Sequence, residues 1–312
     1  MNYNQEIGLT MIGRKEFITG LTAGTVGTAL TGCANARSAA PDCIAAAKDP
    51  NAAKITFIGT SHGAVTPWRF SSCTLLQYGG KNYVIDAADG AVSRIMQQGV
   101  KIPDLDAVFI THPHSDHFGG LSMLLGQHSF QNFSYRRKLK EKKPIEVLLP
   151  GPELLRTITE AHKLPYVGQL SGYQHVRKYG PGVIFDDGMV KVTAYGNDHM
   201  GRRPDGTQFA HSLLFELSNG KRIYFSGDVS KEFDLPLEPF EKGRVDLLVC
   251  ELVHYPIKNA VERLKGREIG KVCFQHYGDN WESPGWEERF AAFASQLTVP
   301  AERVADLDVR FV

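Results

Sequence analysis

The feature that most constrains this chain is a cluster of three histidines and one aspartate within six residues. His112, His114, Asp116 and His117 follow directly after the apolar stretch 107–110, which is typical of a buried strand, and precede a stretch with helical periodicity. Imidazoles and carboxylates are the side chains that bind zinc and related transition metals. A catalytic zinc keeps one coordination position open, so four such side chains are more than a single ion needs. The spacing therefore predicts a strand-to-helix turn that serves two metal ions.

The rest of the chain predicts alternating strands and helices. Strands are expected where short apolar segments lie between turn residues, at 55–58, 73–78, 82–86, 107–110, 145–149, 190–195, 212–217, 222–225, 246–250 and 271–275. Helices are expected where apolar residues recur with helical spacing, at 90–98, 116–125, 153–162, 259–265 and 286–297. Two strand-rich halves that each supply helices favour an α/β sandwich with helices on its outer faces.

Three further ligand candidates stand near the ends of predicted strands: His199, Asp228 and His276. Together with the His-x-His-x-Asp-His motif, their order and context resemble the metallo-β-lactamase fold superfamily over residues 54–280. The resemblance implies a metal-dependent hydrolase. It also implies an αβ/βα sandwich of two mixed β-sheets with helices on the outer faces.

The resemblance further implies seven ligands for two zinc ions, with Mn²⁺ or Fe²⁺ as alternatives. His112, His114 and His199 would hold the first ion, Asp116, His117 and His276 would hold the second, and Asp228 would bridge both. A hydroxide shared by two ions is a nucleophile near neutral pH. Asp116 and Asp228 are therefore expected to take part in catalysis as well as in metal binding.

Within the superfamily, the opening segments 57–63, 71–76 and 83–87 resemble ribonuclease Z and related phosphodiesterases, which implies a phosphodiester substrate of nucleotide type. Ribonuclease Z carries a His-Glu pair where this chain has Cys250 and Glu251, and this difference argues against tRNA cleavage. We expect His254, supported by Glu251, to act as the proton donor. A histidine on the surface is the alternative interpretation of His254.

Four other side chains are candidates for catalysis or substrate contact. His211 resembles a substrate-binding or supporting histidine of the same branch, or it is an ordinary residue at the start of a strand. Arg202 and Arg203 closely follow His199 and either contact a phosphate or form an exposed turn. His62 lies in the opening loop and is a further substrate candidate. The basic run 136–143 is interpreted as a solvated loop, with binding of an anionic partner as the alternative.

Charge excludes some classes of function. The chain has 35 Lys+Arg and 34 Asp+Glu, a net charge of +1, so no dedicated nucleic-acid partner is expected. The substrate is expected to be a small molecule or a short phosphodiester. Lactonases and sulfate-ester hydrolases of the same fold share the ligand set, and a non-catalytic envelope binding protein is a third alternative. The family likeness is also compatible with a homodimer.

The first 32 residues are typical of an export signal. Arg14 and Lys15 precede a mildly apolar run at 18–32, and residues 30–33 resemble a bacterial lipobox whose Cys33 would carry a lipid. We expect a flexible tether at 33–53, a hydrolase domain at 54–312, and a membrane-anchored lipoprotein of the cell envelope. The route of export, twin-arginine or general, and the start, Met1 or Met11, stay open. Cleavage after Ala36 and an N-terminal amphipathic helix are the alternatives.

Overall fold

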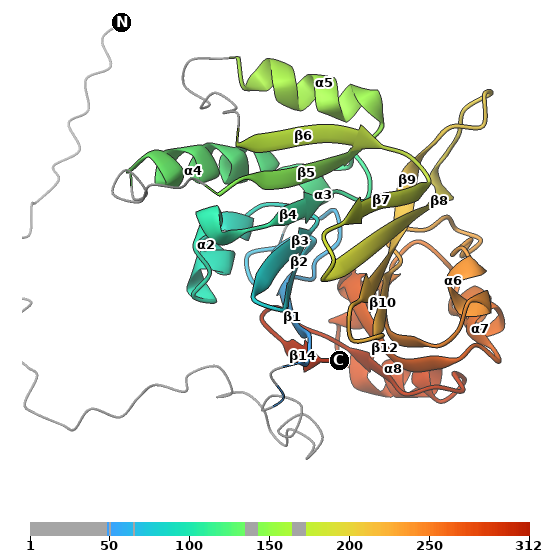
Figure 1. Ribbon diagram of the computed structural model, residues 1–312. Coiled ribbons are helices and arrows are strands. Elements are labelled where there is room, and N and C mark those ends of the chain that lie inside the picture. Colours follow the sequence, from blue (N-terminus) through green and yellow to red (C-terminus); the bar gives the residue numbers. More distant parts are fainter. Residues whose placement is uncertain (1–48, 50, 65, 135–142, 164–172) are drawn as a thin grey trace, which may run out of the picture. The chain divides into compact units, whose positions relative to one another are not determined.

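The computed structural model describes residues 49, 51–64, 66–134, 143–163 and 173–312 (Figure 1). The predicted export signal, Cys33, almost all of the tether and residues 136–142 of the basic run lie outside this part. Within it, no helix has the length and apolar character that crossing a membrane requires. Lys143, the last residue of the basic run, lies 3.0 Å from the Asp106 carboxylate and donates a hydrogen bond to the Asp104 carbonyl, so its contacts are structural.

The described residues form two sheets of seven strands each. The first sheet has the strand order β14-β1-β2-β3-β4-β5-β6, with β1 (Lys54–Gly59), β2 (Cys73–Tyr78), β3 (Lys81–Ile85), β4 (Ala107–Phe109), β5 (Ile145–Pro150), β6 (Gln174–Tyr179) and β14 (Val309–Phe311). The second has the order β13-β12-β11-β10-β9-β8-β7, with β7 (Gly182–Asp186), β8 (Val190–Arg202), β9 (Gln208–Leu217), β10 (Arg222–Phe225), β11 (Val245–Leu252), β12 (Ile269–Tyr277) and β13 (Ala301–Arg303).

Both sheets are mixed. Strands β3 to β6 are parallel to one another, as are β10 to β13, while the remaining neighbours pair antiparallel. This arrangement confirms the predicted sandwich of two mixed sheets.

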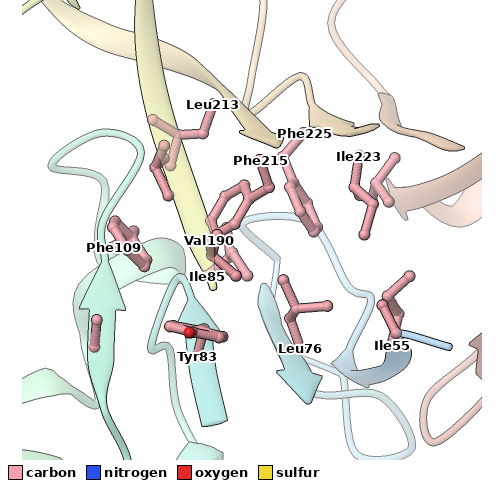
Figure 2. Close-up of a cluster of buried hydrophobic side chains, with 14 of the residues drawn as sticks. Ile55, Leu76, Tyr83, Ile85, Phe109, Val190, Leu213, Phe215, Ile223 and Phe225 are labelled. Carbon is pink, nitrogen blue, oxygen red and sulfur yellow. The ribbon is translucent and has the colours of Figure 1, made fainter. Parts of the chain in front are cut away.

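Alternation along the strands builds the core between the sheets. On β4, Phe109 packs into this core while Val108 packs under helices on the opposite face. On β9, Phe215 joins the same core while Leu214 belongs to the cluster on the outer face of the second sheet. Figure 2 shows side chains of both sheets gathered in the central core. Burying each such side chain contributes about 1.5–3 kcal/mol, which makes the sandwich a firm support for the loops at its edge.

Helices cover the outer faces of the two sheets. They are α2 (Ala91–Gln97), α3 (Ser115–Phe118), α4 (Leu121–Ser134), α5 (Gly151–Ala161), α6 (Glu238–Glu241), α7 (Ile257–Leu264) and α8 (Trp286–Ala294). Buried residues of α2, α4 and α5 pack on the first sheet, and those of α6, α7 and α8 pack on the second (Figure 1).

The single helix predicted at 116–125 is wrong: the segment forms α3 and the start of α4, with a break at Gly119 and Gly120. A Cβ atom on Gly120 would lie 2.0 Å from the Ala88 carbonyl oxygen. The Gly120 amide donates a hydrogen bond to the Ala87 carbonyl, and the Ala87 amide donates one to the His117 carbonyl. These two hydrogen bonds hold α3 against the segment that follows β3.

Four further strands, β6, β7, β13 and β14, were not predicted from the sequence. All four are edge strands, and β6 is mostly polar, without an apolar run. Strands β8 and β9 also extend beyond the predicted segments and form a long hairpin. As a result, His199 and His211 lie within strands instead of at strand ends.

Candidate metal centre

The ligand candidates come from segments that meet at one edge of the sandwich. The motif from His112 to His117 follows β4, Asp228 follows β10, and His276 is the penultimate residue of β12. Carboxyl ends of parallel strands share an edge, which brings together residues that are distant in sequence. His199 is the exception, since it lies on antiparallel β8 where the register shifts between Asn197 and Arg202.

The first group consists of His112, His114, His199 and Asp228. His114 Nδ1 lies 3.0 Å from His112 Nε2 and 3.2 Å from His199 Nε2. Asp228 Oδ2 lies 3.6 Å from His112 Nε2 and 3.7 Å from His199 Nε2. Ligand atoms around a tetrahedral zinc with bonds of about 2.1 Å are roughly 3.4 Å apart, so this group fits one such ion.

The second group consists of Asp116, His117 and His276, again with Asp228. Asp228 Oδ1 lies 3.3 Å from His117 Nε2, and Asp228 Oδ2 lies 3.2 Å from His276 Nε2. Asp116 Oδ2 lies 3.7 Å from His117 Nε2 and 3.8 Å from His276 Nε2. The structure thus brings all seven predicted ligands together, with Asp228 shared by both groups.

The electrostatics of the cluster favour a cation. Burial lowers the pKa of His112 and His199, so both rings are neutral near pH 7 and offer lone pairs. Burial also opposes a charge on His117, but the carboxylates of Asp228 and Asp86 outweigh it and raise the pKa of His117 well above its usual value. His117 Nε2 and Asp228 Oδ1 are buried and have no hydrogen-bond partner among the described residues. A metal ion between them would satisfy both atoms.

Three of the ligand rings are oriented from behind by a second contact. The ring nitrogen Nδ1 of His117 lies 2.7 Å from the Asp86 carboxylate, that of His276 lies 2.7 Å from Ser72 Oγ, and that of His199 lies 3.2 Å from the Val229 carbonyl. Such outer partners set the ring orientation and raise the basicity of a ligand.

Sequence reasoning missed Asp86. Its carboxylate also accepts hydrogen bonds from the Thr111 amide at 2.7 Å and the Thr111 hydroxyl at 2.9 Å, and its backbone is left-handed, with φ 57°. The one available signal was its position directly after the apolar strand ending at Ile85.

His254 lies beside both ligand groups. Its ring centroid is 4.6 Å from that of His199 and 5.9 Å from that of His276. Burial opposes a charge on His254, but the hydrogen bond and charge of Glu251 outweigh it and raise the pKa of His254. Glu251 is itself fixed, since it accepts hydrogen bonds from the main-chain amides of Val229, Val253 and His254.

His254 also forms a group with Asp228 and His276 that could hold a metal. However, His254 Nδ1 lies 3.7 Å from Asp228 Oδ2 but only 3.0 Å from Glu251 Oε1. Glu251 therefore engages Nδ1, and Nε2 is the nitrogen that can exchange a proton with a substrate. This geometry favours the predicted proton donor over a further ligand.

The cluster opens to solvent on one side. His114 is exposed, and Asp116 and His254 are partly exposed, whereas His112, His117, Asp228 and His276 are buried. Substrate can therefore approach from the side of His114, Asp116 and His254.

His211 lies next to the ligand loop without contacting a ligand through its ring. Its amide donates a hydrogen bond to the Thr111 carbonyl, and its ring packs against Tyr179 with centroids 4.9 Å apart. Burial lowers the pKa of His211 to about 4, and neither ring nitrogen has a hydrogen-bond partner among the described residues. The described contacts of the ring are packing contacts, and a catalytic role of His211 stays a prediction.

The geometry also does not support the predicted phosphate contacts of Arg202 and Arg203. Both guanidinium groups are exposed; that of Arg202 lies 3.1 Å from the Asp198 carboxylate, and that of Arg203 lies 2.7 Å from the Glu153 carboxylate. Arg202 lines a groove of about 670 Å³ over β7, β8 and β9, to which no ligand candidate contributes.

Cys250, which the resemblance matches to a histidine of ribonuclease Z, is fully buried and contacts the Tyr255 hydroxyl. Burial raises the pKa of its thiol to about 12, so it does not titrate near neutral pH. Cys73 and Cys273 are likewise buried free thiols.

A family model described as anti-Pycsar protein Apyc1 matches residues 53–299, a range that contains all seven ligand candidates and His254. The chain belongs to the anti-Pycsar protein Apyc1 family. Ribonuclease Z from Archaeoglobus fulgidus is 34% identical over 311 residues, covering 83% of this chain and 98% of that protein. Human zinc phosphodiesterase ELAC protein 1 is 35% identical over 102 residues, covering 33% of this chain and 26% of that protein.

A solved structure shows the same fold at lower sequence identity. The metallo-β-lactamase fold protein YhfI from Bacillus subtilis superposes with a TM-score of 0.62 at 17% identity, covering 84% of this chain and all of that one. This member of the Apyc1 family is therefore a metal-dependent hydrolase of the metallo-β-lactamase fold, close to the ribonuclease Z branch.

Proposed function

We propose that this protein is a dinuclear zinc phosphodiesterase that hydrolyses a small nucleotide-type ester, such as a cyclic nucleotide. The observation that carries the proposal is the pair of ligand groups that share Asp228, with His254 beside both. The names of two relatives, a ribonuclease and a zinc phosphodiesterase, support zinc and phosphodiester chemistry. The near-zero net charge of the chain agrees with a small substrate better than with a long nucleic acid.

Each residue of the site would have its own role in the reaction. Bound zinc ions would lower the pKa of a shared water and draw electron density from the phosphoryl group. Asp228 would help to hold both ions, because its carboxylate lies close to ligands of both groups. As water oxygen bonds to phosphorus and the ester P–O bond breaks, His254 Nε2 would give a proton to the leaving oxygen. Glu251 would stabilise the protonated ring before this transfer.

A panel of substrates tests this proposal. The purified zinc-loaded protein is given bis(p-nitrophenyl) phosphate, cyclic nucleotides, a lactone, an aryl sulfate and a chromogenic β-lactam. We expect turnover of the phosphodiesters, loss of turnover after chelation, and recovery on adding zinc. A preference of orders of magnitude for the lactone or the sulfate would replace the proposal with the corresponding esterase. Absence of turnover on every ester would favour a binding protein.

We also propose that the protein is exported and anchored to a membrane through a lipid on Cys33. The support is the basic pair Arg14 and Lys15, the apolar run 18–32 and the lipobox-like residues 30–33. A Cys33→Ala variant expressed in a bacterial host should move from the membrane fraction to the soluble fraction, while Cys43→Ala, the matched control, should stay with membranes. Membrane association of Cys33→Ala equal to that of the unaltered protein would refute the anchor.

A further inference from the structure

The loop between β1 and β2 forms a rim beside the second ligand group. Gly63 comes so close to Asp116 that a Cβ atom on Gly63 would lie 3.4 Å from Asp116 Oδ2. The His62 ring lies over Gly278, two residues after His276, because a Cβ atom on Gly278 would lie 3.2 Å from His62 Nε2. The loop that carries His62 thus lies against Asp116 and against the residues that follow His276, although His62 is not a member of either ligand group.

A buried arginine fixes this loop to the end of β12. Arg69 is 5% exposed and donates hydrogen bonds to the Thr60 carbonyl at 3.0 Å and the Tyr277 carbonyl at 2.9 Å. Its Nε lies 2.6 Å from the Glu282 carboxylate. The guanidinium therefore joins the residue two positions before His62 to the residue directly after His276.

A second anchor holds both ends of the same loop. The Asp306 carboxylate accepts hydrogen bonds from the Thr60 amide at 2.9 Å, the Thr60 hydroxyl at 2.7 Å and the Phe70 amide at 2.9 Å. The two anchors hold the backbone on both sides of His62 in place before a substrate arrives. Such preorganisation is typical of side chains that contact a reacting group.

The two nitrogens of His62 are in different surroundings. Nδ1 is buried and has no hydrogen-bond partner among the described residues. Nε2 is on the side of the ring that faces Gly278. A buried N–H group without an acceptor is rarer in proteins than an unpaired acceptor. The favoured arrangement therefore leaves the lone pair on Nδ1 and the proton on Nε2, the ring atom nearest Gly278.

We propose that His62 is a substrate-binding residue that donates from Nε2–H to a nonbridging oxygen of the phosphoryl group bound at the second metal position. This inference rests on the proposed phosphodiesterase function and names a phosphate contact on the Asp116 side of the site, distinct from the proton donor His254. Arg69 is a positioning residue, since it acts on the substrate through the loop that carries His62.

The test compares His62→Leu, which removes the donor, with His62→Gln, which keeps an N–H group near the same place. We expect kcat/KM for a cyclic nucleotide to fall roughly 10- to 100-fold in His62→Leu, because the variant loses a hydrogen bond to a charged oxygen. His62→Gln should retain most of the activity. The control is His175→Leu on β6, whose exposed ring contacts Glu146, and it should behave like the unaltered protein.

A binding measurement separates this inference from the proposed function. Calorimetry with inorganic phosphate and zinc-loaded protein should show weaker phosphate binding in His62→Leu, with an unchanged zinc content, whether or not any ester is turned over. Equal phosphate affinity and equal kcat/KM in His62→Leu and the unaltered protein would overturn the role of His62 alone. Absence of phosphodiester turnover in the unaltered protein would instead overturn the proposed function.

Discussion

At the scale of single residues, the role of a histidine depends on which of its two ring nitrogens already has a hydrogen-bond partner. Glu251 occupies His254 Nδ1, and Asp86 occupies His117 Nδ1, so Nε2 is the nitrogen that each ring keeps for other contacts. The two histidines differ in role because they themselves lie in different surroundings. His117 is buried among carboxylates and is suited to hold a cation, whereas His254 is partly exposed and is suited to exchange a proton.

Replacing His254 tests the proton donor. His254→Ala should lower kcat roughly 100-fold or more on a cyclic nucleotide, whose alkoxide leaving group needs a proton. The same variant should lose much less on bis(p-nitrophenyl) phosphate, because p-nitrophenolate leaves without protonation. The measurement is kcat for both substrates at a fixed zinc content. Equal losses on the two substrates would contradict proton donation and point to a structural role of His254.

At the scale of elements, the site depends on how the ends of β3 and β4 are joined. Asp86 follows β3 and holds Thr111, which follows β4, together with His117 on α3. Its backbone is left-handed, a conformation that asparagine also tolerates. The Asp86→Asn substitution therefore changes charge while keeping the local backbone.

Asp86→Asn should weaken zinc binding at the second position by about 10- to 100-fold, because the His117 ring loses a charged partner. Zinc titration in the presence of a competing chelator measures the affinity. Asp186→Asn, at an exposed position of β7, is the matched control and should leave the affinity unchanged. Zinc affinity of Asp86→Asn equal to that of the control would show that Asp86 does not support the metal site.

Only part of this arrangement of strands and helices could be predicted from the sequence. The ligand motif is contiguous, so its position after a strand could be predicted from local spacing alone. The break between α3 and α4 could not, because it results from a contact between Gly120 and the Ala88 carbonyl that no local pattern encodes. Asp86 was missed for the same reason, since its partners Thr111 and His117 are distant in sequence.

Proximity in sequence is also a poor guide to proximity in the folded chain. Arg202 and Arg203 lie within four residues of His199, yet the β8–β9 hairpin carries both to exposed ion pairs. His254, by contrast, lies near the ligands because β11 is the immediate neighbour of β10 and β12 in the sheet.

At the scale of the whole molecule, the two sheets are joined at their edges by one charged cluster. Glu302 on β13 of the second sheet lies 2.6 Å from Arg310 Nε on β14 of the first sheet, and 3.0 Å from Lys271 Nζ on β12. Burial opposes the charge of Glu302, but the hydrogen bonds and charges of Arg310 and Lys271 outweigh it and lower its pKa to about 2. The ionised form of Glu302 is therefore the form that stabilises the fold.

The low pKa of Glu302 predicts how stability depends on pH. The folded-state pKa lies below the ordinary glutamate value of 4.5, so the contribution is fully present above that value and is lost as pH falls toward 2. Near pH 7, Glu302→Gln should lower the free energy of unfolding by roughly 1–2 kcal/mol, a figure reduced for the partial exposure of the pair. Urea unfolding of both proteins from pH 7 down to pH 2 measures the difference, which should shrink with acid. A difference that stays constant over this range would contradict the assignment.

The central claim is that one shared carboxylate, Asp228, joins two metal positions into a single catalytic centre. The most direct test is the metal content of the purified protein, measured by mass spectrometry against protein concentration. The account predicts about two zinc ions per chain in the unaltered protein and a clear loss in Asp228→Ala, since both groups lose a ligand. One ion or none in the unaltered protein, or an unchanged content in Asp228→Ala, would contradict it.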